Sequence, residues 1–285
     1  MAQLYELKDA VLRGTLLHNL SAESQQEWKD RIRRVVEDPN NAFVPRHANA
    51  GKIIGRHLIM HNGIKVHPLS YYDRPMLQML TTNQGVHEPE EERAFQVVLG
   101  MLPDRPVMIE LGSYWAFYSM WFLRQSRNGR CFMVEASPDY MATGQRNFEC
   151  NSLSGEFTCS KVASRSQPDT VCMDDFVAAR KLETVHILHS DIQGAELEML
   201  AGSKNLLSEE KIWFVFISTH SNPLHDDCLR VLSEHGYVVL RNTNLDKTSS
   251  ADGLIVACSP STYTQRRSEL GQLEFRSQDV HIYGG

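Results

Sequence analysis

The pattern of apolar and polar positions along the chain changes near residue 88. Beyond that point, short apolar runs typical of buried strands alternate with segments of helical period. The strand-like runs cover residues 106–111, 130–135, 157–162, 185–190, 212–219, 237–241 and 253–258. The helical segments lie near 115–126, 138–149, 194–207 and 223–235. Because strands that alternate with helices of about 10–15 residues form parallel βαβ units, we predict a doubly wound α/β domain over residues 88–260.

The last two strand-like runs, 237–241 and 253–258, are joined by an irregular segment without a helical pattern. Parallel neighbours need a longer crossover, usually a helix, so this link favours an antiparallel pair. We therefore expect a mostly parallel sheet with an antiparallel strand at one edge. Residues 261–285 are polar and are expected to form a C-terminal tail.

Residues 1–87 follow a different pattern, which predicts a helical and hairpin extension. The first 40 residues have helical character. Residues 56–67 contain two apolar runs on either side of Asn62-Gly63, a dipeptide that strongly favours a hairpin turn. Residues 68–87 show no sustained period and are expected to be a loop with a short helix. We expect this extension to act as a lid over a pocket, as a homo-oligomer contact, or as both.

Composition restricts the class of protein. Hydrophobic residues make up 42% and charged residues 22% of the 285 positions, as in an ordinary globular protein. No apolar run approaches the ~18–20 residues needed to cross a bilayer, and the first residues do not resemble a signal peptide, so we expect a cytoplasmic protein. The net charge of −6 argues against a nucleic-acid partner. The six cysteines are scattered without a C-x-x-C pair, which makes a metal finger or disulfide framework a weak interpretation.

The turn after the first predicted strand of the α/β domain is the most informative segment. The strand ends at Glu110, turns at Gly112 and leads into a helix. Ligands of doubly wound folds bind beside this turn. A dinucleotide needs bare helix N–H groups for its pyrophosphate, hence G-x-G-x-x-G. This turn has one glycine followed by Tyr114 and Trp115, and Glu110 would repel a phosphate, so an NAD-dependent oxidoreductase is a disfavoured alternative.

S-adenosylmethionine suits this turn better, because it carries no phosphate and its methionine end has an ammonium and a cationic sulfur. A carboxylate such as Glu110 favours those charges. The second strand ends at Glu135, where a carboxylate can accept hydrogen bonds from ribose hydroxyls. The fourth strand ends at Asp191 above the same crevice. We expect Asp191 to position the donor's amino group, a substrate hydroxyl or a metal ion.

Several segments, taken in order, resemble the FkbM-type methyltransferases. They are Glu88-Pro89, Ile109–Ser119, Val134-Glu135-Ala136-Ser137-Pro138, Asn147 with Asn151, Met173-Asp174-Asp175-Phe176, and the block D-x-x-G-A-E-x-x-x-L-x-G from Asp191 to Gly202. The last block is the most specific. The resemblance implies a Rossmann-like methyltransferase sheet, S-adenosylmethionine as the donor, and O-methylation of sugars or other small-molecule hydroxyls, often in natural-product biosynthesis.

The resemblance also implies where the cofactor lies. The expected cofactor-binding residues are Glu88, Glu110, Gly112 and Ser113 toward the methionine end, Glu135 at the ribose, Ala136 and Ser137 beside the adenosine, Val162 and Ala163 near the adenine, and Asp191. Three positions depart from the family pattern. Ala116 replaces a second glycine, His189 a lysine, and Gln193 a glutamate. The last two keep open a non-catalytic cofactor-binding or assembly protein as an alternative.

An alcohol that accepts a methyl group also loses a proton, so a positioned base can add ~10²–10⁴ in rate. His220 follows the fifth strand and has the near-neutral pKa such a base needs, although it could instead cap the next helix. Asp191 is the second candidate, directly or through a bound Mg²⁺ ion. Tyr72, Tyr114, Trp115, Tyr118 and His220 are expected to line the acceptor pocket, with core packing as the alternative for the aromatic residues. The leading hypothesis is an S-adenosylmethionine-dependent O-methyltransferase of a small molecule.

Overall fold

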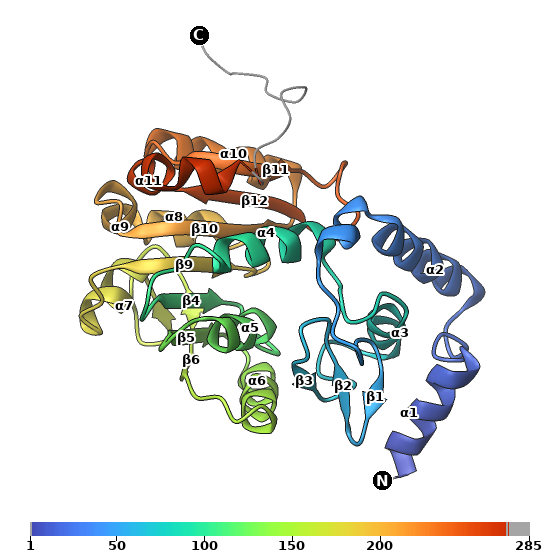
Figure 1. Ribbon diagram of the computed structural model, residues 1–285. Coiled ribbons are helices and arrows are strands. Elements are labelled where there is room, and N and C mark those ends of the chain that lie inside the picture. Colours follow the sequence, from blue (N-terminus) through green and yellow to red (C-terminus); the bar gives the residue numbers. More distant parts are fainter. Residues whose placement is uncertain (1, 272, 274–285) are drawn as a thin grey trace.

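The computed structural model describes residues 2–271 and 273, which form a large α/β domain with the N-terminal extension packed against one end of it (Figure 1). Seven strands form the main sheet in the order β11-β12-β10-β9-β4-β5-β6. Their bounds are β4 (Val107–Leu111), β5 (Arg130–Glu135), β6 (Glu156–Cys159), β9 (Val185–Ser190), β10 (Ile212–Thr219), β11 (Val238–Thr243) and β12 (Gly253–Cys258). Each lies within two residues of a predicted strand, apart from the end of β6.

The sheet is mostly parallel, as predicted. Strands β6, β5, β4, β9 and β10 run parallel, and β12 pairs antiparallel with both β10 and β11. The last two strands therefore form the expected antiparallel pair at one edge, with β12 inserted between β10 and β11. The register places Glu110 opposite His189, so their side chains are neighbours on one face of the sheet.

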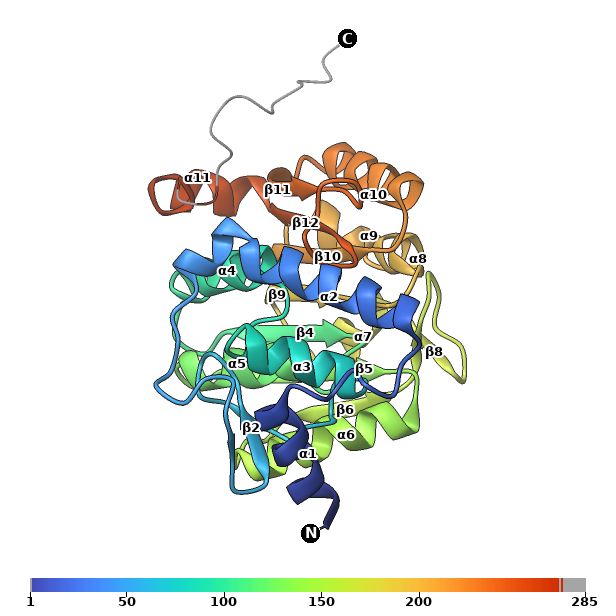
Figure 2. The same cartoon turned by 90° about the vertical axis from the view of Figure 1, so that its right-hand side faces the viewer.

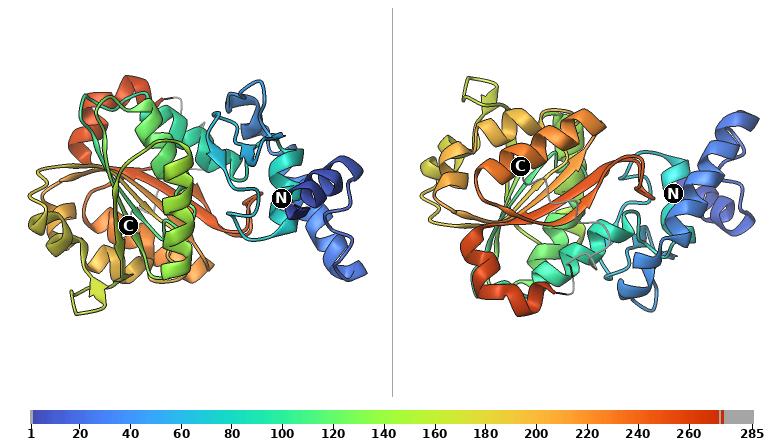
Figure 3. Two further views of the ribbon diagram at one scale, coloured as in Figure 1. Left: turned by 90° about the horizontal axis from the view of Figure 1, so that it is seen from below. Right: turned by 90° about the horizontal axis from the view of Figure 1, so that it is seen from above.

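Helices cover both faces of the sheet (Figure 3). One core contains apolar side chains of α4 (Pro89–Leu99), α5 (Phe117–Gln125), α6 (Pro138–Cys150) and α11 (Pro260–Leu270). The other contains those of α7 (Met173–Ala179), α8 (Glu196–Ala201), α9 (Lys204–Ser208) and α10 (Asn222–Glu234). The strand residues Met108 and Ile187 belong to the first core, so Glu110 and His189, two positions further along their strands, face α4 and α5.

Three segments differ from the expected elements. The helix predicted over 194–207 is two short helices, α8 and α9. The strand predicted over 157–162 leaves the main sheet after β6, and its end becomes β7 (Lys161–Val162), which pairs with β8 (Thr170–Val171). The segment expected as a polar tail begins with α11, which buries Leu270. Within the part of the chain that is described, no helix is long and apolar enough to cross a membrane.

The extension contains the predicted helices and hairpin. Its elements are α1 (Ala2–Arg13), α2 (Ala22–Glu37), the 3-10 helix η1 (Pro39–Phe43), β1 (Ile53–Ile54), β2 (His57–Ile59), β3 (Lys65–Val66) and α3 (Arg74–Thr82). Strands β2 and β3 pair antiparallel with Leu58 opposite Val66, and Gly63 in their turn has a φ of +82°. Figure 2, viewed from this side, shows α2 and α3 in front of the α/β domain.

Two asparagines, one in the last turn of α6 and one at its C-cap, attach the hairpin to the α/β domain. Asn151 accepts a hydrogen bond from the amide of Lys65 (3.0 Å) and donates one to its carbonyl (2.6 Å). One turn earlier, Asn147 accepts from the amide of His67 (3.2 Å) and donates to the carbonyl of Trp115 (3.0 Å). These side chains satisfy backbone groups at the edge of the hairpin. They fix the extension beside the loop that follows β4.

Candidate functional site

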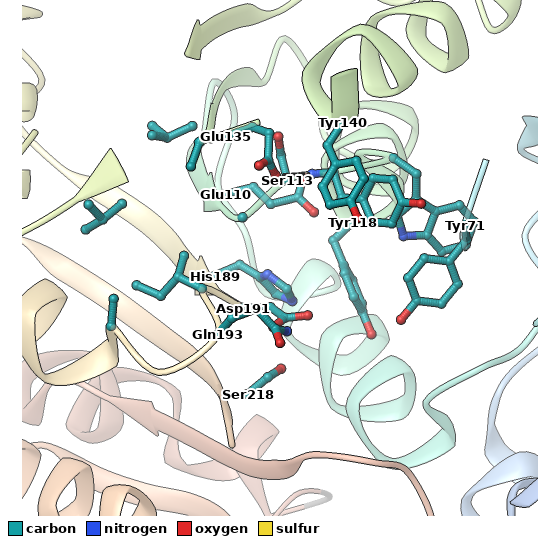
Figure 4. Close-up of a pocket in the computed structure, with 18 of the residues that line it drawn as sticks. Tyr71, Glu110, Ser113, Tyr118, Glu135, Tyr140, His189, Asp191, Gln193 and Ser218 are labelled. Atoms are coloured by element: carbon teal, nitrogen blue, oxygen red, sulfur yellow. Dashed lines mark hydrogen bonds between the residues drawn. The ribbon is translucent and has the colours of Figure 1, made fainter. Parts of the chain in front are cut away.

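A cavity of about 390 Å³ lies at the carboxyl ends of the parallel strands, where the extension meets the sheet (Figure 4). Twelve of the residues expected at the site line it: Tyr72, Glu88, Glu110, Gly112, Ser113, Tyr114, Trp115, Tyr118, Glu135, Ala136, Val162 and Asp191. They come from the ends of β4, β5, β7 and β9, from the start of α4, from α5 and from the extension. In the sequence these residues are spread over more than a hundred positions, and the doubly wound topology brings them together.

Three expected residues lie outside the lining. Ser137 caps α6, accepting a hydrogen bond from the amide of Tyr140, and its own amide donates to Glu135 Oε1 (2.8 Å). The amide of Ala163 donates to the carbonyl of Val171 in the β7–β8 pair (3.0 Å). His220 sits behind Asp191 in a cluster of acids.

The β4 turn and the β9 turn pack directly on each other. Gly112 has a φ of +71°, and a Cβ atom at this position would lie 1.8 Å from the carbonyl oxygen of Asp191. Only glycine fits here, because both the conformation and the space exclude a side chain. Four residues later, Ala116 is buried with a φ of +59°. This left-handed conformation is the one that the glycine expected from the resemblance would adopt freely.

Glu135 is held by backbone amides at the end of β5. Its Oε2 accepts a hydrogen bond from the amide of Tyr114 (3.0 Å) and its Oε1 accepts from Ser137. A carboxylate offers about four lone-pair positions, so both oxygens can still accept bonds from a ligand. The Tyr114 ring stacks on Tyr140 with centroids 4.1 Å apart. This end of the cavity thus combines a fixed acceptor with a flat aromatic wall.

Glu110 is buried at the end of β4, where its Oε2 accepts hydrogen bonds from the hydroxyl and the amide of Ser119. Burial raises the pKa of Glu110 to about 7, because the low-dielectric surroundings disfavour the charged form. Beside it, the buried hydroxyl oxygen of Ser113 has no hydrogen-bond partner among the described residues. Buried hydroxyls are almost always bonded, so Ser113 offers a bond to a molecule in the cavity.

The charge of the lining is mainly negative. Glu88, Glu110, Glu135 and Asp191 line the cavity, whereas its cationic side chains include Lys161 and His87. Glu88 accepts a hydrogen bond from the hydroxyl of Tyr118 (3.0 Å). A cavity with this balance favours a cation and disfavours a diphosphate.

His220 is surrounded by carboxylates. Its Nε2 lies 3.1 Å from Asp191 Oδ1 and 3.6 Å from Asp252 Oδ1, and its Nδ1 lies 3.1 Å from Glu196 Oε1. Burial alone would lower the pKa of His220, but hydrogen bonds to Asp191 and Glu196 outweigh it and raise the pKa to about 10. The imidazole is therefore protonated at neutral pH, and both of its nitrogens donate.

Several lining residues were not expected, notably His87, Tyr140, His189 and Ser218. His189 attracted notice only as a departure from the family pattern. In the structure its Nε2 lies 2.7 Å from Oε1 of Glu91, a buried residue of α4. In the sequence, the acids in the first turn of this helix are explained by its dipole alone. Their pattern therefore gave no sign that Glu91 pairs with His189.

The same helix turn holds a further buried acid. Glu92 lies 2.7 Å from His87 Nδ1 and 3.0 Å from His61 Nε2. The pKa of His87 rises to about 10, because the charges of Glu88 and Glu92 outweigh the opposing effect of burial. No sequence pattern joins these residues, since the pairs form only when α4 packs against the hairpin and the sheet.

No group of three or more His, Cys, Asp or Glu side chains is arranged to hold a metal ion within residues 2–271 and 273. The carboxylate of Asp191 is instead paired with the His220 cation. We therefore assign no metal-binding role to Asp191.

Comparisons with known proteins place the chain among methyltransferases. The methyltransferase FkbM domain family matches residues 61–239, which is more than half of the chain and begins inside the extension. A search of curated proteins gives no match.

Solved structures give distant matches. Methyltransferase FkbM from Methylobacillus flagellatus KT is 18% identical, with 67% of this chain and 56% of that chain covered and a TM-score of 0.46. Precorrin-6y C5,15-methyltransferase from Geobacter metallireducens GS-15 is 16% identical, with 59% and 88% covered and a TM-score of 0.43. TrmK from M. capricolum, solved with S-adenosyl-homocysteine, is 13% identical, with 59% and 68% covered and a TM-score of 0.43. Likeness at this level carries no argument about the substrate.

Proposed function

Because the chain belongs to the FkbM family of S-adenosylmethionine-dependent methyltransferases, we propose that it methylates a hydroxyl group of a small molecule. The observation that carries this proposal is one cavity in which Glu110, Glu135 and Asp191 converge beside an aromatic wall. Its volume of about 390 Å³ lies in the range of pockets that hold a cofactor or another small molecule.

The residues present fit S-adenosylmethionine, which supplies an electrophilic methyl group on a cationic sulfur when bound. Glu135 has free lone pairs for the ribose hydroxyls, and Tyr140 and Val162 offer apolar contact to the base. Gly112 lines the cavity at the turn, and the unpaired hydroxyl of Ser113 suits the polar methionine end. Glu110 balances the positive charge there, and a bound cation would lower its pKa.

The acceptor belongs on the opposite side of the cavity, above β9 and β10. Tyr71 of the extension stacks on Trp115 with centroids 4.5 Å apart and planes at 10°. The amide of Tyr72 donates to the hydroxyl of Tyr114 (2.9 Å). These contacts hold the extension over the cavity, where its rings exclude water and help to align the reactants. Alignment of this kind can lower a barrier by roughly 7–11 kcal/mol.

Asp191 and His220 act as a pair in this proposal. His220 carries a positive charge and lies outside the cavity, so it orients the carboxylate of Asp191 rather than taking a proton. Asp191 then contacts the donor's amino group or the acceptor hydroxyl. Orientation by the half-buried His220 cation fixes one rotamer of the carboxylate, so that binding does not have to supply the entropy of ordering this side chain.

Binding and turnover test the proposal separately. We expect isothermal titration calorimetry to detect S-adenosylmethionine and not NAD, and Glu135→Gln to weaken the binding at least about tenfold, because charge-assisted hydrogen bonds are roughly 1.5–3 kcal/mol each. Glu149→Gln, on the exposed face of α6, is the matched control. Incubation with a labelled methyl donor and a panel of hydroxylated metabolites should then label at least one acceptor.

The alternative is a protein that binds the cofactor without catalysis. Donor binding without label transfer to any hydroxylated acceptor would favour that alternative. Transfer to an amine or a thiol alone would keep the methyltransferase and overturn the choice of a hydroxyl.

A further inference from the structure

A buried histidine–carboxylate pair forms part of the acceptor side of the cavity. His189 stands at the end of β9 and is 3% exposed, and Glu91 of α4 is 4% exposed. Their side chains are joined by the 2.7 Å contact between Nε2 and Oε1. The hydroxyl of Ser218 on β10 donates to the second oxygen of Glu91 (3.4 Å). The carboxylate is thus held from two strands and a helix.

The other imidazole nitrogen of His189 is unused. Nδ1 is buried and has no hydrogen-bond partner in the described part of the chain, although the ring lines the cavity. Figure 4 shows the ring between Glu110 and Asp191 on the cavity wall. A carboxylate that holds Nε2–H fixes the tautomer in which Nδ1 carries the lone pair. Such an imidazole is ready to accept a proton from a hydroxyl placed against it.

Resting on the proposed function, we propose that His189 is the catalytic base of the methyl transfer and that Glu91 is its positioning residue. The acceptor oxygen forms a bond to the methyl carbon while the carbon–sulfur bond breaks and its electron pair stays on sulfur. The hydroxyl proton passes to Nδ1 of His189. The imidazolium that results is stabilised by the carboxylate of Glu91 through Nε2–H.

Charged groups and burial shift the pKa values of both members of this pair. Glu91 on α4, Glu110 on β4 and Asp191 after β9 face the imidazole, and the Tyr118 ring of α5 lies 4.3 Å from it. Burial lowers the pKa of His189, but the hydrogen bond and charge of Glu91 outweigh it, so the pKa is raised. Burial also raises the pKa of Glu91 to about 7. His220 lies outside the cavity and is protonated at neutral pH, because its pKa is raised to about 10.

Histidine NMR titration of the cofactor-free protein tests the pairing without catalysis. We expect the His189 imidazole to titrate with a raised pKa and to show the Nε2–H tautomer when neutral. Glu91→Gln should lower the pKa of His189, because the negative charge at Nε2 is lost. Glu90→Gln, one position earlier on the same helix, should leave the titration unchanged, since Glu90 accepts from Thr243 instead. A pKa of His189 that stays unchanged in Glu91→Gln would overturn the positioning role of Glu91.

Turnover tests the role of the base. His189→Ala should reduce kcat about 10²–10⁴-fold while donor affinity stays within a few-fold of wild type. Added imidazole should restore part of the rate, which a purely structural defect would not allow. His189→Gln, which can still donate to Glu91, should fold normally and remain as slow. A wild-type pH profile retained by His189→Gln would overturn the proposal, whereas a wild-type protein without any turnover would overturn the proposed function itself.

Discussion

The contact between Gly112 and the β9 turn can be tested by adding a single methyl group. In Gly112→Ala the Cβ atom would lie 1.8 Å from the Asp191 carbonyl oxygen. Cβ atoms in proteins essentially never come closer than 3.0 Å to such a neighbour, so the contact is 1.2 Å too close. The neighbour is backbone, so the two turns must move apart. The left-handed conformation costs roughly 1–2 kcal/mol for a residue other than glycine. Overpacking adds roughly 1–3 kcal/mol.

Gly55→Ala is the matched control. Gly55, in the turn between β1 and β2, has a φ of +59°, and a Cβ atom there would meet nothing within 4 Å. This variant therefore carries only the conformational cost. Taking about 2 °C of Tm per kcal/mol, we expect the Tm of Gly112→Ala to fall about 2–6 °C further than that of Gly55→Ala.

The same displacement should weaken the binding of S-adenosylmethionine. Moving the turn shifts Asp191, and loss of one charge-assisted hydrogen bond would raise Kd roughly tenfold or more. Differential scanning calorimetry gives the Tm, and isothermal titration calorimetry gives the Kd. Equal Tm losses for the two variants, together with unchanged donor affinity, would refute the argument that the two turns leave no room.

Two further predictions concern the polar contacts around the site. Asn147→Ala should lower the free energy of unfolding by roughly 2–3 kcal/mol, because it leaves the amide of His67 and the carbonyl of Trp115 without their partner. Urea unfolding measures this loss. Limited proteolysis should also cut the hairpin sooner in the variant than in the wild type. The pKa of His220 is raised from 6.5 to about 10 by its acidic partners, so its stabilising effect is complete below about pH 6.5 and is lost as the pH rises through about 10. The gap in urea midpoint between wild type and His220→Gln should close over that range, and a gap independent of pH would contradict the ion pairs.

The sequence predicted the sheet well because its inner strands, such as β4, β9 and β12, are buried on both faces and stand out as apolar runs. The errors lie where tertiary contacts determine the end of a strand or a helix. Residue Ser160 was expected inside a strand, but its amide donates to the carbonyl of Glu135 while the chain turns away from the sheet. The predicted helix over 194–207 breaks near Gly202. The chain packs closely here, since an added Cβ at Gly202 would lie 2.6 Å from the carbonyl oxygen of Ala163.

The proposed cofactor side of the site was more predictable than the proposed acceptor side. Glu110, Gly112 and Glu135 occupy strand ends, and strand ends can be located from local patterns. Glu91 and His189 are 98 residues apart in sequence, and nothing local links them. His220 was expected to line the acceptor pocket as a candidate base, but it lies outside the lining. Its protonation depends on Glu196 and Asp252, which approach it only through packing.

The two halves of the cavity differ in how freely their walls can change. The β4 turn is locked against the β9 turn at Gly112, so few substitutions there would be compatible with folding. Tyr71 and Tyr72 belong to a separate layer attached by side chains of α6 and by Tyr114. Directed evolution toward new acceptors should therefore vary the residues of this layer. Substitutions there can change the acceptor pocket without altering the β4 and β9 turns on the proposed donor side.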